Sequence, residues 1–229
     1  MALEHRYDRN FLALTSEECK TLHAAWVTVV GCGGLGGYVA EQLARIGVGH
    51  LRLIDSDIFE ESNLNRQLFC TETSLGMSKV QVAAKRLAEV NSEICVDTCK
   101  EALTCDNASE LIAESQCVID CLDNVQARFQ LALACQKSEI PLVYGAISGW
   151  FGQVSTIMPK DTSFVSIYGA VEDKKADDSQ GNLPFSAGVV ASFQVAEAIK
   201  VLLGKPDILR NRLLMIDLLF GSVENLPLL

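Results

Sequence analysis

The chain has 229 residues, of which 49% are hydrophobic and 21% are charged, so it can build a sizeable core and does not have the composition of a disordered protein. Its formal net charge of −10 argues against nucleic-acid binding, which needs a basic surface. The charged start and the lack of an apolar run as long as a membrane span predict a protein without signal peptide or membrane segment. Nine scattered cysteines are typical of reduced thiols and predict a cytoplasmic location.

Residues 1–25 are predicted to form an N-terminal arm that ends in a helix over 16–25. Thr15 or Ser16 can cap this helix, and Glu18 lies in its first turn, where a negative charge is favourable. The remaining residues, 26–229, are predicted to form a single domain.

A strand, a glycine turn and a helix follow the arm. Trp26–Val30 is a short β-branched run, suited to a strand buried on both faces. Gly31, Gly33 and Gly36 have the GxGxxG spacing, which permits a tight turn, lets the backbone approach a phosphate and lets the helix pack closely on the strand. The free N–H groups at the start of such a helix can bind phosphate.

His50–Ile54 is predicted to be the second strand, and Asp55 at its tip can accept a hydrogen bond from a ribose hydroxyl. Together with the glycine turn, this acidic residue about twenty positions later predicts a nucleotide site. A glycine turn in an α/β fold that binds no ligand is the alternative.

The rest of the chain alternates between helical and strand patterns. We expect helices over 77–91, 107–114, 124–138 and 186–203, and strands over 94–98, 117–122, 141–147, 152–158 and 213–218. The alternation through residue 147 predicts an α/β fold with a Rossmann-like, doubly wound and mainly parallel sheet, and the later strands predict an antiparallel extension. The polar, acidic segment 159–184 is predicted to be a mobile loop or crossover.

The loop that begins at Asp57 concentrates hydrogen-bond donors, because Asn63, Asn65, Arg66 and Gln67 lie within five residues. A nicotinamide site does not need so many donors, whereas a triphosphate site does, since arginine binds phosphate oxygens bidentately. Lys79, near the start of the next helix, is a second candidate phosphate ligand. The alternative is a solvated polar loop with an ordinary surface lysine.

Asp123 ends another predicted strand and is followed by Asn124 and Arg128. The carboxyl ends of parallel strands meet at one edge of the sheet, so Asp123 is expected beside the glycine turn. A carboxylate there can hold Mg²⁺ that bridges phosphates, or it can simply cap the following helix. The residues alone leave both interpretations open.

These motifs together resemble the ThiF/MoeB/HesA family of the ubiquitin-activating-enzyme superfamily. The resemblance covers nearly the whole chain and is carried by GCGGLGG, LIDSD, SNLNRQ, GMSK and CLDN with Arg128. It implies an adenylyltransferase that uses ATP and Mg²⁺ to activate the C-terminal glycine of a small ubiquitin-like sulfur-carrier protein ending in Gly-Gly. It also implies a homodimer, with thiamine- or molybdopterin-type sulfur transfer as the setting.

The resemblance also assigns roles by position. It implies catalytic roles for Arg66 and Lys79, which neutralise phosphate charge, and for Asp123, which orients Mg²⁺. It implies that Arg9 reaches into the site of the partner subunit. The predicted nucleotide-binding set comprises Gly31, Gly33, Gly34, Gly36, Asp55, Asp57, Asn63, Asn65, Arg66, Gln67, Lys79, Asp123, Asn124 and Arg9.

The sequence departs from the family pattern in its cysteines. Many relatives hold a structural zinc with two CxxC pairs, but the first pair would fall near 163–168, which reads SFVSIY. We therefore expect no zinc, since the CxxxC pairs Cys95/Cys99 and Cys117/Cys121 do not provide four convergent ligands. No cysteine follows Cys135, and the position of the family's crossover-loop cysteine is about Asp177. We expect an enzyme that stops at the adenylate.

Two other functions remain as alternatives. One is a non-catalytic nucleotide-binding scaffold. The other is an NAD-dependent oxidoreductase, against which the Asn- and Arg-rich loop and the lack of a clear catalytic His or Tyr–Lys arrangement argue. His5, His23 and His50 are isolated from one another in the sequence, and none is assigned a catalytic role. Trp150 and Phe151, between two predicted strands, can line a channel for an extended tail or belong to the core.

Overall fold

The computed structural model describes residues 5–169 and 180–228. They form one eight-stranded sheet with the order β3-β2-β1-β4-β5-β6-β7-β8. The strands are β1 (Trp26–Val30), β2 (His50–Ile54), β3 (Cys95–Cys99), β4 (Cys117–Asp120), β5 (Leu142–Ser148), β6 (Phe151–Ile157), β7 (Arg212–Asp217) and β8 (Ser222–Pro227).

The sheet changes direction at β5. Strands β1 to β5, the parallel half, pair in parallel, whereas β6, β7 and β8, the antiparallel half, extend the sheet in antiparallel fashion. The doubly wound sheet with an antiparallel extension is thereby confirmed. Strand β8 was not predicted, because it is an edge strand that is exposed along its whole length and therefore has no burial pattern to read.

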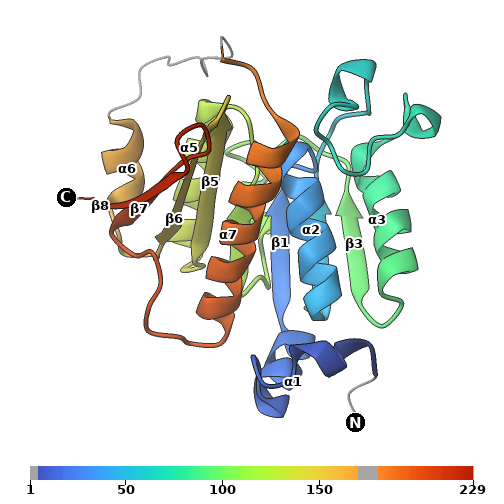
Figure 1. Cartoon of the computed structure of the whole chain (residues 1–229), viewed down its shortest axis with the longest axis horizontal. Coiled ribbons are helices and arrows are strands. Elements are labelled where there is room, and N and C mark those ends of the chain that lie inside the picture. The colour runs from blue at the N-terminus through green and yellow to red at the C-terminus, as the bar shows by residue number, and fades with distance from the viewer. Residues whose placement is uncertain (1–4, 170–179, 229) are drawn as a thin grey trace.

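Helices cover both faces of the sheet. They are α1 (Ser16–Ala24), α2 (Gly34–Ile46), α3 (Lys79–Val90), α4 (Ala108–Leu111), α5 (Val125–Lys137), α6 (Ser163–Tyr168) and α7 (Pro184–Leu202). Figure 1 shows α2 and α7 side by side on the near face and α5 behind the sheet. The described residues also form three short 3₁₀ segments: η1 (His5–Asn10), η2 (Glu61–Asn63) and η3 (Glu72–Ser74).

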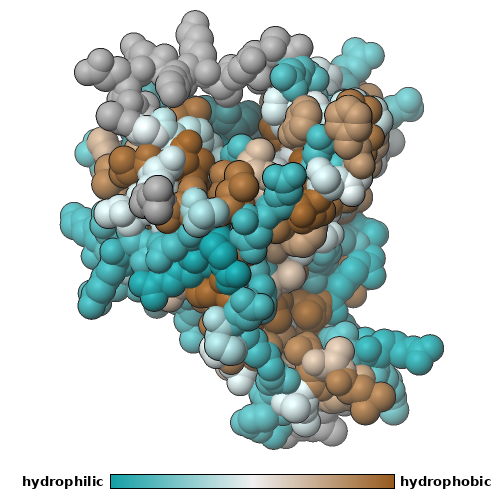
Figure 2. Space-filling view, turned by 60° about the vertical axis from the view of Figure 1, so that its left-hand side comes forward, coloured by the Kyte–Doolittle hydropathy of each residue, from teal (hydrophilic) through white to brown (hydrophobic). Residues whose placement is uncertain are grey.

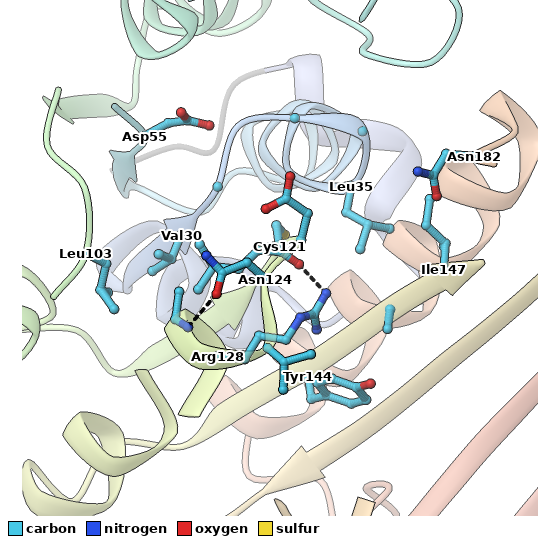
Figure 3. Close-up of a pocket in the computed structure, with 18 of the residues that line it drawn as sticks. Val30, Leu35, Asp55, Leu103, Cys121, Asn124, Arg128, Tyr144, Ile147 and Asn182 are labelled. Atoms are coloured by element: carbon cyan, nitrogen blue, oxygen red, sulfur yellow. Dashed lines mark hydrogen bonds between the residues drawn. The ribbon is translucent and has the colours of Figure 1, made fainter. Parts of the chain in front are cut away.

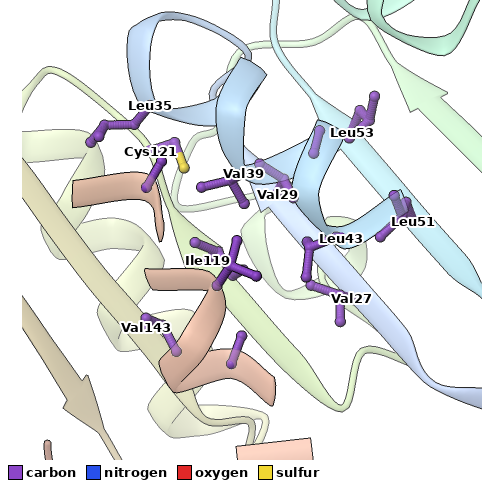
Figure 4. Packing of buried hydrophobic residues seen from close by; sticks show 14 of the residues in the cluster. Val27, Val29, Leu35, Val39, Leu43, Leu51, Leu53, Ile119, Cys121 and Val143 are labelled. Carbon is purple, nitrogen blue, oxygen red and sulfur yellow. The ribbon is translucent and has the colours of Figure 1, made fainter. Parts of the chain in front are cut away.

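The central strands are buried on both faces, as their β-branched sequences predict. On one face, Val29 of β1, Leu53 of β2 and Ile119 of β4 pack with Val39 and Leu43 of α2 (Figure 4). Burying each large aliphatic side chain contributes about 1.5–3 kcal/mol. The second core lies under α4, α5 and α6, where Val30, Ile54, Val118, Leu142 and Tyr144 belong to one buried cluster.

The N-terminal arm packs on the end of the domain that lies away from the glycine turn (Figure 1). Tyr7 of η1 is buried and accepts a hydrogen bond from Asn91. Gly47 ends α2 with φ of +94°, and a Cβ there would lie 2.7 Å from the Tyr7 ring. Thr15 caps α1 in a capping box with Glu18, as the sequence predicts.

Three expectations need correction. Strand β4 ends at Asp120 rather than at residue 122, so Asp123 lies in the following loop. Segment 159–184 contains the helix α6, in which Phe164 is buried against the second core, while residues 170–179, including Asp177, lie outside the described residues. Helix α4 is shorter than 107–114, and Glu114 beyond its end has a positive φ of 68° that a helix does not continue through.

Helix α7 corrects the statement that no apolar run in the sequence is as long as a membrane span. Its 19 residues are long and apolar enough to cross a membrane by length and composition alone. In the structure, half of the apolar window is buried, and the helix belongs to the core shared with α2 and strands β4, β5 and β6. The core helix of a globular domain satisfies the same test as a membrane span.

Candidate functional site

A cavity of about 800 Å³ opens at the carboxyl ends of β1, β2 and β4 and continues along β5 and β6. Its glycine-turn arm is lined by Gly33, Asp55, Arg66, Gln67, Lys79 and Asp123, and its β5–β6 arm by Ala146, Ser148, Phe151, Gln153 and Tyr168. Figure 3 shows Asp55 and Tyr144 on different sides of this cavity. A volume of this size suits a ligand as large as a nucleotide.

The glycine turn separates structural from ligand-facing positions. Gly31 has φ of +95°, and a Cβ there would lie 2.5 Å from the Cys121 carbonyl oxygen. A Cβ on Gly36 would overlap the Gly31 carbonyl oxygen, so this glycine permits close packing, as predicted. Gly33 precedes α2 without a side-chain cap, so the first N–H groups of this helix are free to bind an anion in the cavity.

Asp55 joins the glycine turn to the second strand. Its Oδ2 accepts a hydrogen bond from the Cys32 N–H at 2.7 Å, and its Oδ1 accepts one from the Asp57 N–H at 2.8 Å. The carboxylate still lines the cavity. It therefore holds the turn in shape, and its contact with a ribose stays a prediction.

Lys79 is not an ordinary surface lysine, because only 7% of the residue is exposed. Its Nζ donates a hydrogen bond to Asp57 Oδ2 at 2.9 Å, and its backbone N–H donates one to the Asp57 carbonyl oxygen. The Asp57 side chain is exposed on the other side of this pair. Asp57 thus holds a nearly buried cation at the cavity wall.

Arg66 and Gln67 bring the polar loop to the cavity. Arg66 Nη1 donates hydrogen bonds to the Ser62 carbonyl oxygen at 3.0 Å and to Asn65 Oδ1 at 2.9 Å. Gln67 is buried beside Gly33, and its Oε1 has no hydrogen-bond partner among the described residues. An unpartnered buried amide beside a free helix N-terminus is a group that a ligand can satisfy.

The two asparagines of the loop brace it instead. Asn63 is buried, and its Oδ1 accepts a hydrogen bond from the Glu60 N–H at 3.1 Å. Asn65 Nδ2 donates a hydrogen bond to the Asn182 carbonyl oxygen at 3.1 Å. The structure thus gives both side chains a place in holding the segment that carries Arg66, and direct nucleotide contact by either one stays a prediction.

The loop after β4 carries an exposed carboxylate into the cavity. Asn124, not Asp123, caps α5, because its Oδ1 accepts a hydrogen bond from the Ala127 N–H at 2.9 Å. The alternative that Asp123 is the helix cap is therefore wrong. Asp123 lines the cavity and has no hydrogen bond or ion pair with residues 5–169 or 180–228.

A single carboxylate fits the way in which Mg²⁺ is held at nucleotide sites, by one or two carboxylates together with phosphate oxygens and water. Within the described ranges, no three His, Cys, Asp or Glu side chains gather closely enough to hold a metal ion by themselves. Asp123 is free to coordinate, and the uncapped start of α2 faces the same cavity. The residues present therefore fit a metal ion that arrives with its nucleotide.

A buried ion pair at the floor of this cavity was not predicted. Asp120, at the end of β4, is fully buried, and its Oδ2 lies 3.2 Å from Nη1 of Arg128. Burial raises the pKa of the Asp120 carboxyl, while Arg128 opposes the rise. An aspartate inside the apolar strand CVID was the available signal, because a buried carboxylate needs a partner.

The sequence analysis also missed cavity residues that carry no motif, namely Leu103, Tyr144, Gln153, Tyr168 and Asn182. Phe151 lines the cavity, and Trp150 is 42% exposed and packs on Phe185 with ring centroids 4.9 Å apart. The interpretation of Trp150 and Phe151 as core residues is therefore wrong.

Arg9 lies far from this cavity within one chain. It is exposed in η1, and the neighbouring Asn10 donates a hydrogen bond to the Ile46 carbonyl oxygen at the end of α2. The cavity lies at the other end of this 13-residue helix, about 20 Å away at 1.5 Å per residue. Arg9 can therefore reach such a cavity only from a second copy of the chain.

Comparison with known proteins shows which family this chain resembles along most of its length. Residues 7–228 match the ThiF family. The chain is 33% identical to the SAMP-activating enzyme E1 of Haloferax volcanii over 97% of this chain and 84% of that protein. It is 35% identical to the molybdopterin-synthase adenylyltransferase of Haemophilus influenzae, over 93% of this chain and 90% of that protein.

Other relatives are longer. The chain is 36% identical to the adenylyltransferase and sulfurtransferase MOCS3 of Culex quinquefasciatus, but it spans only 48% of that protein. Among solved structures, E. coli MccB with AMPCPP and MccA superposes with a TM-score of 0.87, at 22% identity, over 100% of this chain and 72% of that one. This likeness concerns the fold alone.

Proposed function

Because this chain belongs to the ThiF family, we propose that it is an ATP-dependent adenylyltransferase that activates the C-terminal carboxylate of a small ubiquitin-like sulfur-carrier protein. One observation carries the proposal. The helix N-terminus at Gly33, the cations Arg66 and Lys79, and the Asp123 carboxylate, which has no partner among the described residues, all line one cavity. A cavity of this kind suits a nucleoside triphosphate and its metal ion.

ATP binds in the glycine-turn arm in this proposal. The N–H groups at the start of α2 and the Arg66 guanidinium bind phosphate oxygens, and Asp55 accepts a hydrogen bond from the ribose. Asp123 would hold Mg²⁺, which would supply positive charge to neutralise the phosphates. The free energy of binding thus comes largely from charges that the fold holds in place beforehand.

The acceptor carboxylate enters through the β5–β6 arm. Residues Ala146 and Ser148 of β5 and Gln153 of β6 leave room there for an extended tail of small residues, such as Gly-Gly. A carboxylate oxygen of the tail attacks the α-phosphorus of ATP, and the bond between this phosphorus and the bridging oxygen of the β-phosphate breaks. The products are an acyl-adenylate and pyrophosphate.

Like charges meet in this step, so the protein must neutralise them. Lys79 lies at the cavity wall, and we propose that it moves from Asp57 toward the departing pyrophosphate. Arg66 is on the same side of the cavity. Preorganised charges of this kind stabilise the transition state more than they would in water.

The proposal includes three finer points. The enzyme acts as a homodimer in which Arg9 of each chain reaches the other cavity. The carrier serves thiamine- or molybdopterin-type sulfur transfer. The reaction ends at the adenylate, because no cysteine follows Cys135 in the sequence to form a thioester from the crossover segment.

ATP–pyrophosphate exchange tests this function. We expect exchange in the presence of Mg²⁺ and a ubiquitin-like carrier ending in Gly-Gly, and none with the same carrier lacking its last glycine. No exchange with any carrier of a broad panel, although ATP binds, would contradict the proposal and would favour a non-catalytic scaffold. Tight binding of NADH in place of ATP would favour an oxidoreductase.

A further inference from the structure

Arg128 connects three segments at the floor of the cavity, and only 5% of this residue is exposed. Its Nη1 donates hydrogen bonds to Asp120 Oδ2 at 3.2 Å and to the Gly145 carbonyl oxygen of β5 at 2.7 Å. Its Nη2 donates one to the Leu122 carbonyl oxygen. The guanidinium thus joins the end of β4, the loop after it and the neighbouring strand, and Figure 3 shows it between Cys121 and Tyr144.

The loop that carries Asp123 is held from both sides. The Leu122 N–H donates to Asp120 Oδ1 at 2.9 Å, and the Leu122 carbonyl oxygen accepts from Arg128. On the other side, Asn124 is fixed as the cap of α5. Both neighbours of Asp123 are therefore anchored, whereas its carboxylate keeps its full capacity to bind a ligand.

A second layer of contacts holds Arg128 itself. The guanidinium carbon lies 5.2 Å from the ring centroid of Tyr144, which suits a cation–π contact. The Tyr144 hydroxyl lies 2.9 Å from the Tyr168 hydroxyl and donates a hydrogen bond to Gln153 Oε1 at 3.1 Å. Burial raises the pKa of both tyrosines, so they remain neutral beside the cation.

These contacts hold the loop that carries Asp123, and the sequence motifs do not reveal them. We propose that Arg128 is a positioning residue that sets the Asp123 carboxylate for the metal ion of the nucleotide, with the Tyr144–Tyr168 pair as its brace. The inference rests on the proposed function, because it assumes the metal at Asp123. The residue that holds a metal ligand in place commonly changes metal affinity about 10- to 100-fold when it is lost.

The substitution Arg128→Lys tests this role. Lysine keeps a positive charge beside the buried Asp120, which protects the fold, but a single ammonium cannot replace a planar guanidinium that reaches three acceptors. We expect the Leu122 carbonyl to lose its charged donor and the Asp123 loop to lose its fixed position.

The measurement is ATP affinity by calorimetry, once in EDTA and once over a Mg²⁺ titration. We expect Arg128→Lys to weaken the apparent Mg²⁺ affinity about tenfold and to leave the ATP affinity in EDTA nearly unchanged. Asp123→Asn serves as the reference for loss of the ligand itself. Arg86→Lys serves as the matched control, because Arg86 pairs with Glu41 on α2, in contacts separate from those of Arg128.

Three results would overturn the inference. The first is an unchanged Mg²⁺ affinity in Arg128→Lys. The second is an equal loss of ATP affinity with and without Mg²⁺ in this variant, which indicates a merely structural role, and the third is a wild-type protein whose ATP affinity does not depend on Mg²⁺. If Arg128→Lys does not fold, Tyr168→Phe decides, since it removes one hydroxyl and keeps the ring. A weaker Mg²⁺ response in that variant supports the role, and an unchanged one overturns it.

The two proposals can fail separately. Absence of carrier-dependent pyrophosphate exchange contradicts the proposed function, whereas the Mg²⁺ titration needs no carrier and reports on Arg128 alone.

Discussion

Strand β1 of the parallel half and strand β8 of the antiparallel half present their side chains in different ways. In the parallel half, β1 is buried at four of its five positions, and the loops at the strand ends bring Asp55, Arg66 and Asp123 to the cavity. In the antiparallel half, β8 is exposed throughout, and Phe220 at the hairpin turn is 81% exposed. Figure 2, with this side turned forward, shows hydrophobic residues reaching the surface in groups between hydrophilic ones.

This difference indicates that the two halves of the sheet have different roles. The parallel half holds charges in fixed places, as chemistry on a triphosphate requires. Three exposed aromatic residues, which can contact a protein partner, lie in the β5–β6 turn, at the start of α7 and in the β7–β8 turn: Trp150, Phe185 and Phe220. The β5–β6 turn is joined to the end of β7, because the Leu218 N–H donates a hydrogen bond to the Trp150 carbonyl oxygen at 3.0 Å.

The largest effect is expected from the charged wall of the glycine-turn arm. Lys79→Ala and Arg66→Ala should each lower pyrophosphate exchange about 100- to 1,000-fold, because each removes a cation that stabilises the transition state. Circular dichroism should show a folded protein. Lys85→Ala, an exposed position on the same helix α3, is the control that should keep full activity. Wild-type exchange in both variants would refute the assignment.

Stability should respond differently to a methyl group added at two helical glycines, Gly36 of α2 and Gly188 of α7. Gly36→Ala places a Cβ against the Gly31 carbonyl oxygen and should lower the free energy of unfolding by about 1–3 kcal/mol or more. Gly188→Ala in α7 meets only Tyr38 atoms at 3.8 Å or beyond, and should raise stability by about 0.5–1 kcal/mol. Urea unfolding measures both. Equal effects would contradict the packing described for the glycine turn.

The exposed aromatic residues should affect the protein substrate and not the nucleotide. Trp150→Ala should raise KM for the carrier about fivefold, as expected for loss of roughly 1 kcal/mol at an interface, with ATP affinity unchanged. Leu133→Ala on α5, also an exposed apolar residue, is the matched control. A change in ATP affinity with unchanged KM for the carrier would reverse the roles of the two regions.

The smallest effect is expected where the N-terminal arm contacts the chain after α7. Hydrogen bonding to Lys205 lowers the pKa of Glu18 from 4.5 to about 2. A lowered carboxyl pKa contributes stability above 4.5 that is lost as the pH falls toward about 2, so Glu18→Gln should be less stable than wild type at neutral pH and equal to it near pH 2. Urea midpoints across this range, with Glu17→Gln as control, measure the effect. A difference in urea midpoint between wild type and Glu18→Gln that does not change with pH would contradict a contribution from the ionisation of Glu18.

Much of the fold was predictable because it depends on local patterns. The period of apolar residues marks α2 and α3, and Thr15 caps α1. The short turn between β5 and β6, which leaves no room for a helix, marks the start of the antiparallel half. Strand β8 and helix α6 escaped prediction, since one has no buried face and the other is a six-residue helix held by tertiary packing.

The candidate site was predictable in its members and not in their pairings. The glycine spacing named Gly33, the SNLNRQ loop named Arg66, and the GMSK segment named Lys79; the structure brings all three to one cavity. The sequence alone did not reveal that Lys79 pairs with Asp57, 22 residues earlier, or that Asp120 pairs with Arg128.

The sequence by itself thus determined the family, the doubly wound sheet and the glycine turn, because each follows from residue spacing or from a backbone conformation that glycine favours. Only the tertiary structure decided which polar groups brace one another and which stay free for a ligand. The physical reason is that burial and distance set the strength of a charge, and both arise only when distant segments pack together.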